Sequence, residues 1–332
     1  MFRMGGAASG RCRGARFALA FVSDLGFKGR LRTFATITPM AISHDLDRSD
    51  APDPQWLERM YNNRVRVPDH GDYFARWAAA SALARRGMAC ELDVPYGDGP
   101  REALDTFPAA RKGAPLAVFV HGGYWKSLDK AEHGFAAAAL HDLGAAVVAP
   151  NYGRCPQCSI EQITLQLARA TAWAWRHARD LNADPRRVVV VGHSAGAHLA
   201  AMLLACAWPV FDAALPAGLV KGALGLSGIY DLAPLMDVPS LQEVLRITPR
   251  QARIASPARL AAPRRGRFYA LAGGEESHEF LRQNRLLQQA WGRERVPLAQ
   301  AVAGLNHFSI VDALAAPGSR VHGVARQLLR WA

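Results

Sequence analysis

Two glycine-containing motifs place a serine hydroxyl and a set of backbone amides where they could carry out acyl-transfer chemistry. Residues Gly192–Gly196 read GHSAG, the G-x-S-x-G form of a nucleophile elbow. Residues His121–Trp125 read HGGYW, the form of a loop whose amides bind a carbonyl oxygen as it becomes negative. Together they predict that Ser194 attacks a carbonyl carbon and forms a covalent acyl-serine.

The residues around the elbow predict the local structure that the motif needs. Val188–Val191 is an unbroken β-branched run, as expected for a strand that is buried on both faces of a parallel sheet. Ala195–Leu204 is rich in strong helix formers. Ser194 should therefore lie in a tight turn at a helix N-terminus, where free N–H groups favour negative charge.

The upstream loop follows another apolar run, Leu116–Val120, which also reads as a buried strand. We predict that the amides of Gly123, Tyr124 and Ala195 form the oxyanion hole. One such donor contributes about 3–4 kcal/mol to lowering the barrier.

A serine nucleophile needs a general base, and the base follows the acid in the chain order of this motif class. His307 comes just after the strand-like run Leu298–Val302 and is the predicted base. His278 is a weaker candidate, His198 is expected to pack inside the molecule, and His322 lies in the expected C-terminal helix.

The acid that orients this base should follow the preceding strand, Phe268–Ala272. Glu275 and Glu276 both stand in the loop after it, and spacing alone leaves the choice open. Asp231 is a third candidate that follows an earlier strand and fits the order less well.

Three aromatic residues near these motifs, Trp125, Tyr152 and Tyr230, could form a flat apolar wall against an aryl substrate. They could equally belong to the hydrophobic core, and the sequence leaves both interpretations open.

The motifs resemble those of the kynurenine formamidase (arylformamidase) family of the α/β-hydrolase superfamily. The resemblance extends from about residue 55 to the C-terminus. It rests on the two motifs above and on the segments Glu276–Phe280, His307–Val311, Tyr61–Arg64, Pro150–Tyr152 and Leu226–Leu232. HGGYW and the ESHEF segment are the more specific of these, since G-x-S-x-G occurs in many esterases.

The resemblance implies a Ser–acid–His triad that hydrolyses N-formyl-L-kynurenine to L-kynurenine and formate without a cofactor. It also implies that Glu276 is the acid, at a position where eukaryotic members carry aspartate. The alternative is a short-chain carboxylesterase with the same catalytic groups. A non-catalytic ligand-binding relative is a remote alternative, because the chain retains both nucleophile and base.

The 332-residue chain is 50% hydrophobic and is long enough for one large domain. Strand-like runs alternate with expected helices such as Lys130–Leu143 and Ile160–Asn182. This pattern predicts an α/β-hydrolase fold, with a mostly parallel sheet and helices on both faces. We expect a single domain over residues 40–332, with lid elements at 54–86 and 230–267.

The net charge of +12 is unevenly distributed. Residues 1–39 carry half of it and are nearly free of acidic residues. We expect this extension to be disordered; a targeting peptide and an upstream translation start are the two explanations considered. The remaining charge shows no pattern of a nucleic-acid module, and no apolar run is long enough to cross a membrane.

Five cysteines are too few for a disulfide scaffold, which favours a cytoplasmic location. The pair Cys155 and Cys158 forms a C-x-x-C that lacks a second pair for zinc and is interpreted as two loop thiols. We expect a small-molecule substrate and no metal; the oligomeric state stays open, with a homodimer as one alternative.

Overall fold

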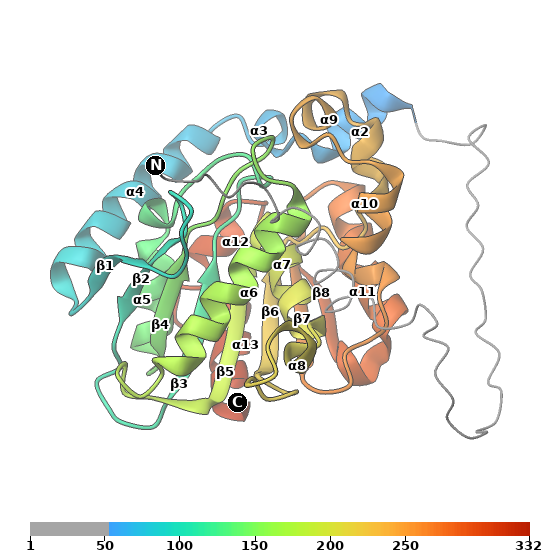
Figure 1. Ribbon diagram of the computed structural model, residues 1–332. Helices are drawn as coiled ribbons and strands as arrows, with labels where there is room; N and C mark the ends of the chain where they lie inside the picture. The colour runs from blue at the N-terminus through green and yellow to red at the C-terminus, as the bar shows by residue number, and fades with distance from the viewer. Residues whose placement is uncertain (1–52) are drawn as a thin grey trace, which may run out of the picture.

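A central eight-stranded β-sheet organises the computed structural model, which describes residues 53–332 (Figure 1). The strand order is β1-β2-β4-β3-β5-β6-β7-β8. β1 and β2 pair antiparallel with their neighbours, and the other strands run parallel. The strands are β1 (Glu91–Pro95), β2 (Ala103–Phe107), β3 (Ala114–Val120), β4 (Ala146–Pro150), β5 (Ala183–His193), β6 (Val220–Leu226), β7 (Arg267–Gly273) and β8 (Leu298–Val302).

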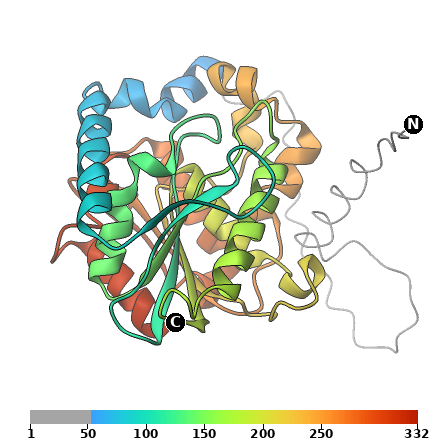
Figure 2. The same cartoon turned by 60° about the vertical axis from the view of Figure 1, so that its left-hand side comes forward.

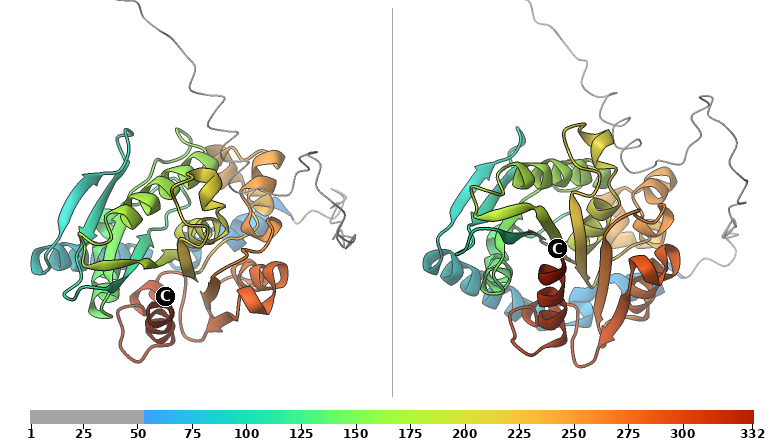
Figure 3. Two further views of the ribbon diagram at one scale, coloured as in Figure 1. Left: turned by 60° about the horizontal axis from the view of Figure 1, so that its bottom comes forward. Right: turned by 90° about the horizontal axis from the view of Figure 1, so that it is seen from below.

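Helices cover both faces of this sheet, as the two rotated views show (Figures 2 and 3). One face is covered by α6 (Ile160–Arg176), α7 (Ala195–Ala205) and α11 (His278–Arg295). The other is covered by α4 (His70–Gly87), α5 (Gly134–Asp142), α12 (Ser309–Asp312) and α13 (Arg320–Trp331). The predicted α/β-hydrolase fold is confirmed.

The alternation of side chains along the central strands explains why they read as unbroken apolar runs. In β3, Leu116 and Val118 belong to the core on one face of the sheet, whereas Ala117 and Phe119 belong to the core on the other. A strand that is buried on both faces needs an apolar side chain at every position. The four predicted strands are present, and the one predicted at Leu298–Val302 has the same bounds as β8.

The two helices expected from sequence are shorter in the structure. The first is divided at His133 into the 3₁₀ helix η2 (Lys130–Glu132) and α5. The second begins at Ile160, where the Ser159 hydroxyl accepts a bond from the Gln162 amide, but it ends at Arg176 and not at Asn182. His177 caps it with its backbone N–H and stacks its ring on Trp173.

Short helices gather above the carboxyl ends of the parallel strands. They are α2 (Pro54–Tyr61), α3 (Asn63–Arg66), η3 (Ala233–Asp237), α9 (Pro239–Leu245) and α10 (Pro249–Ile254) (Figure 1). Residues 53–332 also form η4 (Pro257–Arg259) and, near the opposite end of the sheet, α8 (Trp208–Phe211). The Ser240 hydroxyl donates to the Glu58 carboxylate at 2.6 Å and joins α9 to α2. These helices come from both segments expected as lid elements, but the rest of the first segment is α4, which covers a face of the sheet.

The extension 1–39 and the first residues of the expected domain lie outside the described residues. Among residues 53–332, no helix is both long and apolar enough to span a membrane.

Candidate active site

Ser194 lies in a sharp turn between β5 and α7, as the elbow motif predicts. Its backbone has φ 55° and ψ −117°, a conformation that is strained for a residue with a side chain. A Cβ on Gly192 would lie 2.1 Å from the Gly196 carbonyl oxygen, and one on Gly196 would lie 2.0 Å from the Val120 carbonyl oxygen. Only glycine therefore permits this close approach of strand and helix.

A chain of hydrogen bonds connects Ser194, His307 and Glu276. Nε2 of His307 lies 3.1 Å from Oγ of Ser194, and Nδ1 of His307 lies 2.7 Å from Oε2 of Glu276. Because a carboxylate only accepts hydrogen bonds, Nδ1 carries the proton and Nε2 is left to accept the serine proton. All three residues are buried, so water competes little for these bonds.

The second oxygen of the Glu276 carboxylate is also fully engaged. Oε1 accepts the Gly273 amide at 2.6 Å and the Ser227 hydroxyl at 2.5 Å. Glu275 is exposed, and Asp231 forms an ion pair with Arg259 at 2.9 Å. Of the three acids that the sequence left open, only Glu276 meets His307.

Ser227 is a residue of this site that the sequence analysis did not single out. It follows β6 and has a φ of 55°, and its amide donates to the Leu271 carbonyl at 2.7 Å. The positive φ of a non-glycine residue is a mark of special local geometry, but a sequence does not display it. Its hydroxyl holds the Glu276 carboxylate against the loop after β7.

The HGGYW loop passes directly beside the elbow. A Cβ on Gly122 would lie 3.2 Å from Cβ of Ser194, and Gly123, Tyr124 and Trp125 all have positive φ. Within residues 53–332, the amides of Gly123, Tyr124 and Ala195 donate to no protein acceptor. The predicted oxyanion donors therefore lie next to the serine with unused N–H groups.

Tyr152 supports this loop through contacts with its first residue, His121. The Tyr152 hydroxyl donates to the His121 carbonyl at 2.9 Å, and the two rings stack with centroids 4.3 Å apart. Nε2 of His121 lies 3.1 Å from Oδ1 of Asn151. Burial, with a smaller effect from the nearby His133, lowers the pKa of His121 to about 3, so its ring is neutral.

His193 connects the elbow to the loop that carries His307. Its Nε2 donates to the His307 carbonyl at 2.8 Å. Burial first, and then the neighbouring His307 ring, lower the pKa of His193 well below its usual range. His193 is thus a neutral residue that connects two parts of the site.

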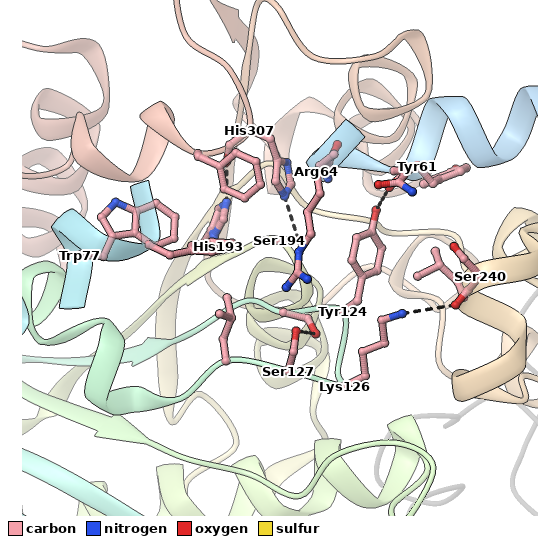
Figure 4. A pocket seen from close by; sticks show the side chains of 17 residues that line it. Tyr61, Arg64, Trp77, Tyr124, Lys126, Ser127, His193, Ser194, Ser240 and His307 are labelled. Carbon is pink, nitrogen blue, oxygen red and sulfur yellow. Dashed lines mark hydrogen bonds between the residues drawn. The ribbon is translucent and has the colours of Figure 1, made fainter. Parts of the chain in front are cut away.

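A cavity of about 250 Å³ opens above Ser194 (Figure 4). This is close to the lower end of the volumes typical of small-molecule sites. Its walls come from both expected lid segments, with Tyr61 and Trp77 from the first and Ser240 from the second. The aromatic residues that line it are Tyr61, Phe74, Trp77, Tyr124 and Phe308.

Comparisons with known proteins agree with this geometry. A sequence family described as having the alpha/beta hydrolase fold matches residues 117–252. A solved structure from Silicibacter sp. tm1040, described provisionally as a thioesterase, superposes with a TM-score of 0.71 and 29% identity over 82% of this chain and 98% of that one. Esterase LipQ of Mycobacterium tuberculosis is 34% identical over 161 residues, which cover 45% of this chain and 37% of the esterase.

Kynurenine formamidase of Danio rerio is 32% identical over 231 residues, which cover 67% of this chain and 76% of the relative. The chain belongs to the kynurenine formamidase family. The resemblance that the motifs suggested is confirmed, and the chain is a hydrolase that acts on amide or ester bonds.

The aromatic wall of this family member differs from the one expected. Trp125, Tyr152 and Tyr230 are completely buried, and none of them lines the cavity. Trp125 packs edge-on against His198, Tyr152 supports the HGGYW loop, and Tyr230 packs against Phe268. All three therefore belong to the core, the alternative that the sequence had left open.

The other candidate histidines and the cysteine pair do not line the cavity. His198 is buried with Nε2 2.6 Å from the Ala255 carbonyl oxygen, His278 is exposed at the start of α11, and His322 is buried in α13. Cys155 and Cys158 are free thiols, and burial raises the pKa of the Cys155 thiol to about 12. In the described part of the chain, no group of three or more His, Cys, Asp or Glu residues is placed to hold a metal ion.

Proposed function

We propose that this chain hydrolyses N-formyl-L-kynurenine to L-kynurenine and formate through an acyl-serine intermediate. The observation that carries the chemistry is the hydrogen-bond chain from Ser194 through His307 to Glu276 at the base of a cavity. The family supports the choice of substrate, since the Danio rerio relative is named for this activity.

In the first half of the reaction, Oγ of Ser194 attacks the formyl carbon. Nε2 of His307 takes the serine proton and then gives it to the aniline nitrogen as the C–N bond breaks. Glu276 holds His307 in the required tautomer and stabilises the imidazolium that forms. The amides of Gly123, Tyr124 and Ala195 bind the oxyanion, and this stabilisation is stronger in the transition state than in the bound substrate.

The second half of the reaction returns the enzyme to its starting state. L-Kynurenine leaves, and a water molecule takes the place of the aniline nitrogen beside His307. His307 removes a proton from this water as it attacks the formyl-serine, and then protonates Ser194 as formate departs. Every group required by these steps belongs to the protein or to water.

A short-chain carboxylesterase is the second candidate. The similarity to esterase LipQ favours it, because the aligned segment is 34% identical. The same catalytic groups would serve an ester, so the two functions differ in the cavity and not in the chemistry. The remote alternative, a non-catalytic binding protein, is disfavoured by the intact hydrogen bond between His307 and Ser194.

The proposal includes a small-molecule substrate and a cytoplasmic location. A cavity of about 250 Å³ suits the former. The free thiols at Cys90, Cys155, Cys158 and Cys206 support the latter, since reducing compartments keep such groups unpaired.

A comparison of substrates tests this function. We expect kcat/KM for N-formyl-L-kynurenine to exceed that for p-nitrophenyl acetate by at least about tenfold, or roughly 1.4 kcal/mol of transition-state binding. The ester has the better leaving group, so this order requires specific recognition of the formamide. A higher kcat/KM for the ester, or no turnover of the formamide, would favour the carboxylesterase.

A further inference from the structure

Two positively charged side chains line the cavity, and the proposed chemistry does not use them. Its lining includes the side chains of Arg64 and Lys126 and no aspartate or glutamate. The hydrolytic steps act on a neutral formamide and require neither cation. A cavity that holds two cations and no carboxylate favours an anionic ligand.

Arg64 is the more available of the two cations. Its side chain is exposed, extends over the cavity toward Ser194 (Figure 4), and forms no hydrogen bond or ion pair with any residue in 53–332. The guanidinium carbon lies 5.5 Å from the centre of the Phe74 ring, which supports it from one side. A guanidinium placed in this way can bind a carboxylate through two parallel hydrogen bonds.

Lys126 lies in the same cavity and is held in place by one bond. Its Nζ donates to the Ser240 carbonyl at 3.3 Å, which leaves two of its N–H groups for a ligand (Figure 4). Burial first, and then the neighbouring Arg64 charge, lower the pKa of Lys126, and Glu58 and Glu243 partly offset this effect. Arg64 and Lys126 repel each other, and an anion bound between them would reduce this repulsion.

Asn63 adds an unsatisfied polar group to the same wall. It is only 3% exposed, and its amide nitrogen has no hydrogen-bond partner in the described part of the chain. A buried donor without a partner costs about 1–3 kcal/mol. An acceptor oxygen of a ligand could satisfy it, since Asn63 lines the cavity.

We propose that Arg64, together with Lys126 and Asn63, forms a carboxylate-binding subsite that receives the α-carboxylate of the substrate. This inference rests on the proposed function, because N-formyl-L-kynurenine carries its formamide and its α-carboxylate at opposite ends. The subsite would position the formyl group at Ser194 and would select amino-acid substrates over neutral aryl formamides. Sites built to pair a polar group reject analogues that lack it.

The kinetic test compares two substrates that differ only in the charged end. They are N-formyl-L-kynurenine and 2-formamidoacetophenone, which keeps the aryl formamide and lacks the amino-acid group. In Arg64→Gln, we expect the ratio of their kcat/KM values to fall at least about tenfold, mainly through a higher KM for N-formyl-L-kynurenine; this corresponds to roughly 1.4 kcal/mol. Because Arg64 is exposed, the variant should keep the fold, which its melting temperature would verify.

Arg66→Gln is the matched control. Arg66 is exposed on the same helix, α3, and does not line the cavity, so the substitution removes the same charge outside the subsite. The ratio should remain within about twofold of wild type. An unchanged ratio in Arg64→Gln would overturn the subsite, and so would equal losses on both substrates or equal effects of the two substitutions.

A binding measurement separates this inference from the proposed function. Calorimetric titration of the full chain with L-kynurenine and with 2-aminoacetophenone needs no turnover. We expect Arg64→Gln to weaken L-kynurenine binding at least about tenfold and to change 2-aminoacetophenone binding much less. If this holds while N-formyl-L-kynurenine is not hydrolysed, the subsite stands and the proposed function falls. If the formamide is hydrolysed and binding of L-kynurenine does not depend on Arg64, the subsite falls alone.

Discussion

Two adjacent glutamates in one loop have different surroundings. The Glu276 carboxylate receives hydrogen bonds from His307, Gly273 and Ser227, whereas Glu275 extends into solvent. A carboxylate that is held on both oxygens can fix the orientation of an imidazole; an exposed carboxylate cannot. The two residues have the same chemistry and differ only in position.

We expect Glu276→Gln to lower kcat by about three to four orders of magnitude, because an amide favours the wrong tautomer of His307. Glu275→Gln is the matched control and should change kcat by less than about threefold. Steady-state kinetics on N-formyl-L-kynurenine would measure both. The opposite ranking would show that the loop after β7 presents the other glutamate to the histidine.

Some residues of the site could be predicted from the sequence and others could not. Ser194 and His307 could be predicted, because each follows a recognisable strand in a motif of fixed order. Ser227 could not, since its hydroxyl meets a carboxylate 49 positions away in the chain. The sequence also could not decide whether Trp125, Tyr152 and Tyr230 form a cavity wall or belong to the core. An aromatic residue near a motif packs into the core as readily as it faces a cavity.

At the scale of elements, a buried hydroxyl connects α2 to α11. The Tyr61 hydroxyl donates to Oε2 of Glu279 at 2.7 Å and accepts from Nε2 of Gln283 at 3.0 Å. Oε1 of Gln283 accepts the amides of Tyr230 and Asp231. These bonds hold α2 and the segment after β6 against α11, which begins just after Glu276.

We expect Tyr61→Phe to lower the free energy of unfolding by about 1–3 kcal/mol, because it leaves buried polar groups unpaired. Tyr269→Phe is the control, since the Tyr269 hydroxyl has no hydrogen-bond partner within residues 53–332; its effect should stay within about 0.5 kcal/mol. Denaturant titration would measure both. Equal effects of the two substitutions would mean that the hydrogen bonds of the Tyr61 hydroxyl do not stabilise the fold.

The pH dependence of this difference has a definite sign. Burial opposes ionisation of Glu279, but hydrogen bonds from Arg282 and Tyr61 outweigh it and leave the pKa below its ordinary value of 4.5. Such a group stabilises the fold fully above its unfolded pKa and loses that contribution as the pH falls through the folded pKa. The difference between wild type and Tyr61→Phe should therefore be largest near neutral pH and decrease below about pH 4.5. A difference that grows in acid would contradict this.

At the scale of the whole molecule, the parallel sheet brings distant segments together. The HGGYW loop follows β3, Ser194 follows β5, Glu276 follows β7 and His307 follows β8. The carboxyl ends of parallel strands meet at one edge of a sheet, where open α/β folds bind their ligands. This much could be predicted from the buried runs, because their chain order determines which loops meet.

The short helices over this edge of the sheet could be predicted only in outline. The segments 54–86 and 230–267 were expected as lid elements, but α4, which makes up much of the first one, packs on a face of the sheet. Which of their side chains face the cavity depends on how α2, α3 and α9 pack against each other, for example through Ser240 and Glu58. Short helices with few apolar positions carry no periodicity that fixes this packing.

The most direct test of the account is the rate of formate release from N-formyl-L-kynurenine by the full chain and by its Ser194→Ala variant. We expect the wild-type chain to release formate and the folded variant to be slower by at least about 10⁴-fold, since removal of a nucleophile in other serine hydrolases costs up to about 10⁶. Circular dichroism would verify that the variant is folded. A variant rate within about tenfold of wild type would contradict the assignment of Ser194 as the nucleophile.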